Sequence, residues 1–309
     1  MTLTTSAGTG APALVPARRK RTNLRSLLMV VLFTAPAMLF MAVFLLYPVI
    51  QNLRYSLYDW NGISKATYRG FANFRELVDD QLFRMVLKHT LELAVFGTAA
   101  AMAIGLLWAY GIERRLPGWR TYRFLLFIPV VMPITVSGVL WSLLLGTGGP
   151  VDTMLTDLGW KNPPVWLGDP KVTLWVVIAV SVWQASGFTM LLILGGMEDV
   201  PRELHEAASL DGTSSLRRLR SIVIPHIRGT LAVLTVLQFI ALLKAFDIVF
   251  AMTAGGPGNA TDVMGTYLYE KSFVELRWGY GSAVAVVMTA VLFVLSFGLY
   301  QRLLRKETE

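Results

Sequence analysis

Two charged residues, Lys244 and Asp247, lie in a stretch that is otherwise free of charge from residue 229 to residue 253. If this stretch is one helix, residues three apart share a helix face, so the ammonium and the carboxylate lie side by side. Charged residues inside a membrane are costly, and they usually line a path for a solute or an ion, or pair with one another. Both interpretations stay open here: contact with a transported solute, or an ion pair near the outer membrane surface.

Three uncharged residues in apolar stretches are further candidates for contact with a solute. Gln184 and Gln238 could contact the solute, or they could form hydrogen bonds between helices. Trp183 could stack on a ring of the solute, although tryptophan is also common where helices meet the membrane surface. Together with the two charged residues, they form the candidate substrate pathway.

Composition excludes several kinds of chemistry. The chain has no cysteine, which excludes disulfides, thiolate metal sites and cysteine nucleophiles. Its three histidines, at positions 89, 205 and 226, are too scattered for a histidine-built metal centre. No G-x-x-x-x-G-K-[ST] phosphate loop occurs. We therefore expect no catalytic residue, cofactor or metal site in this chain, which would not be an enzyme.

The elements that must position these residues are long apolar helices. Hydrophobic residues make up 54% of the 309 residues and charged residues only 16%, far fewer than the quarter found in soluble domains. Crossing a membrane takes roughly 20 apolar residues. Uncharged stretches of that order occur at 26–53, 93–112, 124–151, 172–197 and 278–301, and a sixth span is expected over 229–253. The sequence predicts an all-α polytopic membrane protein with about six transmembrane helices.

The distribution of Lys and Arg predicts the orientation. With the N-terminus inside, the inner segments hold 17 of the 28 basic residues and the outer segments hold 9. The positive-inside rule then places both termini and the loop at 198–228 in the cytoplasm. The net charge of +8 follows from this bias and from contact with anionic lipid, and it does not indicate binding to nucleic acid.

These patterns also predict how the chain is divided. Residues 1–26 form a disordered cytoplasmic tail with a basic cluster at 18–21, residues 27–304 the transmembrane domain, and residues 305–309 the cytoplasmic C-terminus. Outer loops are expected at about 54–85, 148–171 and 254–277. The apolar stretch after the basic cluster is too long for a signal peptide and lacks a cleavage site, so we expect an uncleaved first helix.

The cytoplasmic loop contains the least apolar long segment between two spans, HEAASLDGTSSLRRLRSIVIPHIRG. Pro201 can begin a helix that Gly212 ends. Ser214, or the threonine before it, can cap a second helix that Pro225 closes. Helices this short are not stable alone in water, so their apolar faces need a partner. That partner could be the inner leaflet, with arginines on lipid phosphates, or a protein groove, which the acidic residues and small alanines of the first helix favour.

This segment resembles the EAA loop of ABC importer permeases, E-A-A-x-x-x-G-x(9)-I-x-L-P. The matching residues are Glu206, Ala207, Ala208, Gly212, Ile222 and Pro225, with Asp211 before the glycine and Ile224 where leucine is commoner. FLLFIPVVMP, followed by Trp141, and AFDIVFAMTAGGPGNATDVMGTYLYEKSF at 245–273 resemble the members for oligosaccharides and glycerol 3-phosphate. The resemblance covers about residues 27 to 304. Leu219 replaces a common aromatic residue, and His226 and Arg228 replace apolar or proline positions.

The resemblance implies a permease subunit whose residues 202–210 dock into a cleft on a cytoplasmic ATPase. Glu206 would make the charged contact, Ala207 and Ala208 would allow a close fit, and Gly212 would permit the bend. The implied partners are a second related permease subunit, two copies of the ATPase carrying ATP and Mg, an extracellular solute-binding protein, and membrane lipid. The implied location is a prokaryotic inner (plasma) membrane, crossed several times, and the implied solute is a sugar.

Two other classes of protein remain as alternatives. In a secondary, ion-coupled transporter, Lys244 and Asp247 would form a proton or ion site. Against this alternative, the sequence shows no half-helix break at matched positions of two repeats. An integral-membrane enzyme would need a convergent set of His, Asp or Ser in the spans, and the sequence offers none.

Overall fold

The computed structural model describes residues 24–115 and 117–304. The expected tail with its basic cluster at 18–21 and the C-terminal residues 305–309 lie outside the described residues. The chain divides into two units, residues 1–51 and 52–309. The described part of the first unit is a continuous apolar helix made of α1 (Leu24–Met41), the π-helical turn η1 (Ala42–Leu46) and the start of α2 (Tyr47–Tyr55).

The second unit is almost entirely helical. Its long helices are α4 (Gln81–Glu113), α8 (Thr173–Glu198), α12 (Arg228–Leu243) and α15 (Trp278–Leu304). Shorter elements complete it: β1 (Tyr58–Asp59), β2 (Thr67–Tyr68), α3 (Ala72–Asp79), α5 (Trp119–Val131), α6 (Ile134–Leu144), α7 (Pro150–Asp157), α9 (Arg202–Leu210), α10 (Ser215–Arg218), η2 (Leu219–Val223), α11 (Ile224–His226), α13 (Asp247–Thr253), α14 (Met264–Tyr269) and η3 (Glu270–Val274). The two strands pair antiparallel in one small hairpin.

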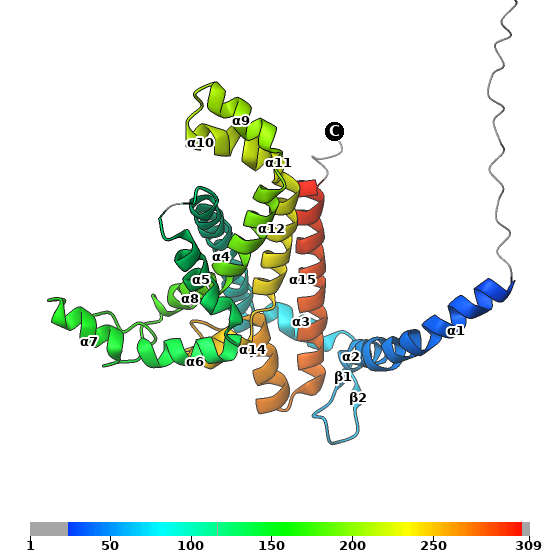
Figure 1. The fold of residues 1–309 in the computed structure, drawn as a ribbon. Coiled ribbons are helices and arrows are strands. Elements are labelled where there is room, and N and C mark those ends of the chain that lie inside the picture. Colours follow the sequence, from blue (N-terminus) through cyan, green and yellow to red (C-terminus); the bar gives the residue numbers. More distant parts are fainter. Residues whose placement is uncertain (1–23, 116, 305–309) are drawn as a thin grey trace, which may run out of the picture. The chain divides into compact units, whose positions relative to one another are not determined.

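The helices form a bundle centred on α4 and α8, which pack along much of their length. Small residues permit this approach: a Cβ on Gly105 of α4 would lie 2.7 Å from Thr189 Cγ2 of α8. Figure 1 shows α9–α11 at one end of the bundle, near the last turn of α15, and β1, β2 and α14 toward the other end. We call these the loop end and the cap end.

Four described helices are long and apolar enough to cross a membrane, and two bent helix pairs could raise the number to six. The expected all-α, polytopic fold with about six spans is therefore confirmed. One predicted span was wrong in shape, however: the stretch at 124–151 is not a single helix. α5 and α6 meet at an angle of 101°, because Pro133 forces Met132 into an extended conformation with ψ of 134°.

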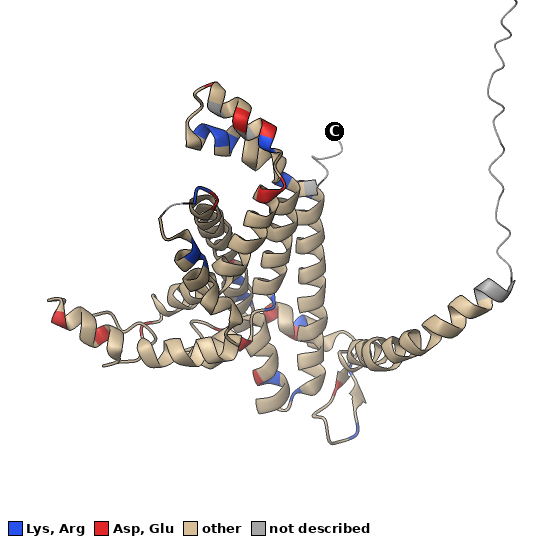
Figure 2. Cartoon of the chain, viewed as in Figure 1, with Lys and Arg blue, Asp and Glu red and all other residues tan. Residues whose placement is uncertain are grey.

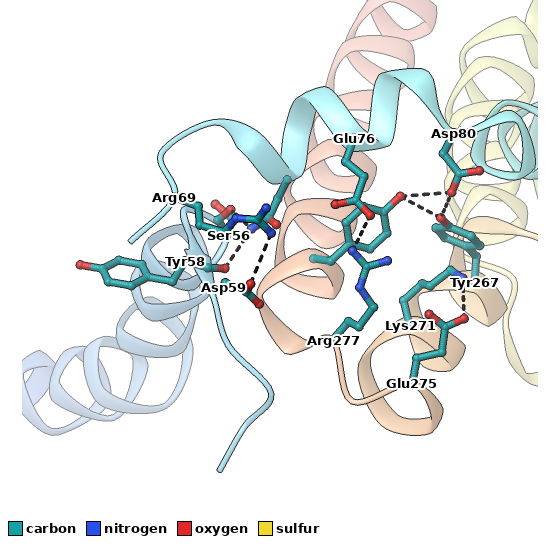
Figure 3. A network of polar contacts seen from close by, with 12 residues as sticks. Ser56, Tyr58, Asp59, Arg69, Glu76, Asp80, Tyr267, Lys271, Glu275 and Arg277 are labelled. Carbon is teal, nitrogen blue, oxygen red and sulfur yellow. Dashed lines mark hydrogen bonds and ion pairs between the residues drawn. The ribbon is translucent and has the colours of Figure 1, made fainter. Parts of the chain in front are cut away.

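Polar contacts join the elements of the cap end (Figure 3). Asp80 caps α4 by accepting a hydrogen bond from the Leu82 N–H at 2.8 Å, and it also accepts from the hydroxyls of Tyr267 and Tyr280. An ion pair between Glu76 and Arg277 joins α3 to the beginning of α15. The start of α4 is thus tied to α14 and α15 by side chains that are far apart in the sequence.

The Asp80 carboxylate should make the stability of this end depend on pH. Burial disfavours its charged form, but the hydrogen bonds from Tyr267, the backbone of Leu82 and Phe83, and Tyr280 outweigh burial and lower the pKa of Asp80 below its usual 3.8. A lowered carboxyl pKa contributes stability that is present above the unfolded pKa and is lost as the pH falls through the folded pKa.

We expect Asp80→Asn to destabilise the protein by about 1 kcal/mol at neutral pH, because Asn keeps the helix cap but loses the charge-assisted bonds. In thermal unfolding in detergent, the difference between the unfolding midpoints of wild type and variant should become smaller once the pH falls below 3.8. Asp79→Asn, at the exposed neighbouring residue, is the control. If this difference in unfolding midpoint is the same at every pH, the charge of Asp80 is not what stabilises the cap end.

Candidate functional site

The loop between α8 and α12 folds as two short helical segments, close to the predicted boundaries. α9 ends at Leu210, and Gly212 has φ of +66°, a left-handed conformation that glycine adopts without strain. Across this turn the Thr213 N–H donates to the Ala208 carbonyl at 3.0 Å. Ser214 then caps α10, its hydroxyl accepting from the Arg217 N–H at 3.4 Å. We call residues 202–226 the coupling loop.

Gly212 is needed only for its backbone, since a Cβ at this position would meet nothing within 4 Å. Gly212→Ala is therefore expected to destabilise the turn by about 1 kcal/mol relative to the wild type. Gly212→Asn should destabilise it less, because asparagine tolerates the left-handed region better than alanine does. Amide hydrogen exchange in α9 should become about fivefold faster in the alanine variant. Equal exchange in the wild type and both variants would show that the turn does not hold α9.

The far boundary of the coupling loop differs from the prediction, because Pro225 does not close it. Pro225 lies within α11, which continues to His226, and the chain bends by 75° into α12 only after that residue. In the continuous helical run from Ser215 to His226, the last turn contains Pro225. The π-helical turn η2 immediately precedes it.

The second helical segment is anchored on the bundle. Leu219 and Val223 of η2 are 8% and 1% exposed, and they belong to one apolar cluster with Ile112 of α4 and Met197 of α8. Ile222 is half-buried at the edge of the same cluster. The apolar residues of this segment thus face the ends of the bundle helices, with the exception of Leu216, which is 53% exposed.

The first helical segment, α9, is much more open. Glu206 and Ala207 are exposed and Ala208 is buried, while Leu204 and Leu210 are exposed apolar residues. Figure 2 shows acidic residues on α9 and basic residues on α10 and η2. The coupling loop thus combines a segment fixed to the bundle with a helix that offers an acid, a small side chain and apolar surface.

Two of the candidate pathway residues, Trp183 and Gln184 of α8, contact the region where α5 and α6 meet. Gln184 of α8 donates from Nε2 to the carbonyls of Pro129 and Met132, at 2.6 and 3.0 Å, and so bonds to the chain where α5 gives way to α6. Trp183 packs edge-on against Trp141 of α6, with ring centroids 5.4 Å apart. The structure therefore brings Trp183 and Gln184 to the bend between α5 and α6.

The other candidates lie along or after α12. The prediction that Lys244 and Asp247 share a helix face was wrong, because α12 ends at Leu243 and α13 begins at Asp247. No ion pair joins the two side chains, and both are exposed. Asp247 instead occupies the first turn of α13, where a carboxylate is favoured by the helix dipole. Gln238, on α12, is half-buried.

One polar cluster lies in the glycine-rich segment 254–262, for which the sequence predicts only part of an outer loop. Asp262 is 2% exposed and accepts a hydrogen bond from the Thr266 hydroxyl at 2.8 Å, while its carbonyl faces His89 Nδ1 of α4 at 3.1 Å. Burial raises the pKa of Asp262. Gly255, with φ of +90°, packs so closely that a Cβ would lie 2.3 Å from Asp262 Oδ1. The signal in the sequence is three glycines, at positions 255, 256 and 258, shortly before Asp262, since glycine allows such a close approach.

Long apolar helices, two sharply broken spans and a polar helical loop at one end define a membrane transport subunit. The chain belongs to the family of binding-protein-dependent transport system inner membrane components, whose model matches residues 101–309. Its relatives are transport components rather than enzymes.

Relatives and a solved structure agree with this membership. The diacetylchitobiose uptake system permease protein NgcF of Streptomyces coelicolor is 32% identical, over 91% of this chain and 83% of that protein. The sulfoquinovosyl glycerol transport system permease protein SmoG of Agrobacterium fabrum is 30% identical, over 90% and 91%. A crystal structure of a bacterial ABC transporter that imports the acidic polysaccharide alginate shares the fold, with a TM-score of 0.81, 20% identity and coverage of 93% and 99%. These matches do not favour an ion-coupled secondary transporter.

Proposed function

We propose that this chain is the membrane-spanning permease subunit of an ATP-driven importer for a sugar. Relatives named for diacetylchitobiose and for sulfoquinovosyl glycerol, and a similar fold in a transporter for alginate, support a sugar as the solute. A second related permease subunit and two copies of a cytoplasmic ATPase complete the importer, and an extracellular binding protein delivers the solute. A bound alginate-loaded periplasmic protein in one similar transporter supports that last partner.

The observation that carries the proposal is the division of the coupling loop into a fixed part and an open helix. In this proposal α9 docks into the ATPase, with Glu206 making the charged contact, Ala207 allowing close approach and Ala208 packing behind them. Gly212 supplies the turn, and Ile222 and Pro225 belong to the segment that rests on the bundle. ATP and Mg are bound by the ATPase and not by this chain.

The proposed mechanism follows from what the coupling loop connects. Because α9 follows α8 after only three residues and α11 leads into α12, movement of a docked α9 reaches both helices. Packed interfaces of this kind switch between discrete arrangements, which would expose the solute path to one side of the membrane and then to the other. Lys244 and Asp247, exposed at the break between α12 and α13, can donate to and accept from sugar hydroxyls.

The proposed orientation keeps the coupling loop and both termini in the cytoplasm of a prokaryotic cell, with the cap end outside. The domain limits follow from it: a tail at 1–26, the permease domain at 27–304 with its outer loops, and a short C-terminus at 305–309. The excess of basic residues on the inner segments supports this arrangement.

The test combines uptake with subunit content. A deletion strain carrying the wild-type chain is assayed with labelled trehalose, maltose, lactose, diacetylchitobiose, sulfoquinovosyl glycerol and glycerol 3-phosphate, and the chain is purified in mild detergent. We expect import of one sugar and co-purification of an ATPase. If glycerol 3-phosphate alone is imported, the solute is not a sugar. Transport without any co-purified ATPase would support an ion-coupled transporter instead.

A further inference from the structure

Six aromatic side chains form a continuous row through the cap end. Each ring contacts the next, with centroids between 4.9 and 6.1 Å apart. The row, which we call the aromatic track, consists of Phe250, Phe246, Tyr269, Phe273, Trp278 and Trp60. It begins at the break between α12 and α13 and ends beside the β1–β2 hairpin.

The aromatic track is not a closed core. Phe250 is 41% exposed and Phe273 is 52% exposed, while Phe246, Tyr269 and Trp278 are half-buried. The rings pack on one another in stacked, tilted and edge-on pairs. Because the exposed rings keep part of their surface open, the track offers an apolar surface that needs no rearrangement to bind a flat partner.

Charged groups accompany the rings along the track. At its inner end Phe246 lies between Lys244 and Asp247 in the chain, and Asp247 precedes Phe250 by three residues, which places them on the same face of α13. Farther out, Lys271 and Glu275 form an ion pair on the segment that carries Tyr269 and Phe273 (Figure 3). Apolar faces and hydrogen-bonding groups therefore alternate.

We propose that the aromatic track binds pyranose rings between their release from the binding protein and their passage at the break between α12 and α13. A pyranose has an apolar face of C–H bonds and a rim of hydroxyls. The first packs on aromatic faces by dispersion and burial of apolar area, and the second bonds to carboxylates and ammonium groups. The inference rests on the proposed function and assigns residues to it.

The role predicts a particular kinetic defect. The sugar is captured first by the binding protein, so the concentration dependence of uptake reflects that protein. Loss of the track acts after release, so it should lower the amount of sugar moved for each ATP hydrolysed. ATP hydrolysis itself, which depends on the coupling loop, should continue.

The test uses the assembled importer in proteoliposomes, with the sugar that the wild-type chain imports from the panel above. Phe273→Ala and Phe250→Ala are compared with Phe297→Ala, whose ring on α15 is 53% exposed and lies outside the track. We expect Phe273→Ala and Phe250→Ala each to lower transport by about 5- to 10-fold, the effect of losing one stacked ring. In both alanine variants, the rate of stimulated ATP hydrolysis should stay within about twofold of the wild-type rate. Phe273→Tyr should restore transport to near the wild-type level, because tyrosine keeps the aromatic ring.

Each other outcome has a distinct meaning. If the wild type imports no sugar, a sugar is not the substrate, and the proposed binding of pyranose rings by the track is refuted with it. If the wild type imports a sugar but the track variants match Phe297→Ala, the track proposal alone is overturned. If the track variants no longer co-purify with the ATPase, the rings hold the subunits together, and the proposed binding of sugar by the track is overturned.

Discussion

Glu206→Lys is expected to abolish sugar uptake while leaving the chain in the membrane. Glu206 is exposed on α9, so a lysine costs the isolated chain little. In the proposed complex the same change places a positive charge in a contact built for a carboxylate, which weakens such contacts by about 2 to 5 kcal/mol. Uptake and binding-protein-stimulated ATP hydrolysis should both fall about 30-fold or more.

Asp199→Lys is the control for this prediction. Asp199 is exposed on the same cytoplasmic segment, but it follows α8 and precedes α9, at a helix end where a positive charge is favoured. The control should keep near-normal uptake and retain the ATPase in mild detergent. Normal uptake by Glu206→Lys would refute docking of α9 and would favour the alternative that the protein is an ion-coupled secondary transporter.

The second large effect is expected for Gln184→Leu. The Gln184 amide donates to the carbonyls of Pro129 and Met132 where α5 ends. Leucine has a similar volume but no donor, so these carbonyls lose a partner inside the membrane. A lost partner of this kind costs about 1 to 3 kcal/mol. We expect the midpoint of thermal unfolding in detergent to fall by several degrees, together with a loss of uptake.

Gln238→Leu is the matched control, since Gln238 is also half-buried in a long helix. Its side chain makes none of the hydrogen bonds that Gln184 makes, so the same substitution should leave the unfolding midpoint nearly unchanged. If Gln238→Leu abolishes uptake without lowering the midpoint, Gln238 contacts the solute. Equal midpoints for wild type and Gln184→Leu would show that packing alone holds the bend between α5 and α6.

The coupling loop was predictable because its local signals agree with one another. Gly212 and Ser214 each have a known local effect, and the structure places the turn and the second helix where those effects require. The end of the loop was missed because the effect of Pro225 depends on the π-helical turn before it. No pattern in residues 219–223 distinguishes that turn from an ordinary helix.

The breaks in the spans were harder to predict, for two different reasons. The first break has a signal in Pro133, which disfavours a helical conformation at Met132, but the length of the uncharged stretch 124–151 also fits a single span. The second has neither glycine nor proline, and only Lys244 and Asp247 mark it. Their spacing of three fits a shared helix face, but an acid can equally begin a helix, as Asp247 does. The row of aromatic rings could not be predicted, because it joins residues from four separate elements.

The contact between α8 and α5 has a consequence for how force travels through the molecule. Besides the Gln184 bonds, Gly187 brings the two backbones together so closely that a Cβ would lie 2.3 Å from the Leu126 carbonyl oxygen. Since a helix rises about 1.5 Å per residue, these two attachments lie roughly 16 to 21 Å from the end of α8 at Glu198. α8 can therefore act as a lever: a tilt at the coupling loop would reach α5 and the bend where α5 meets α6.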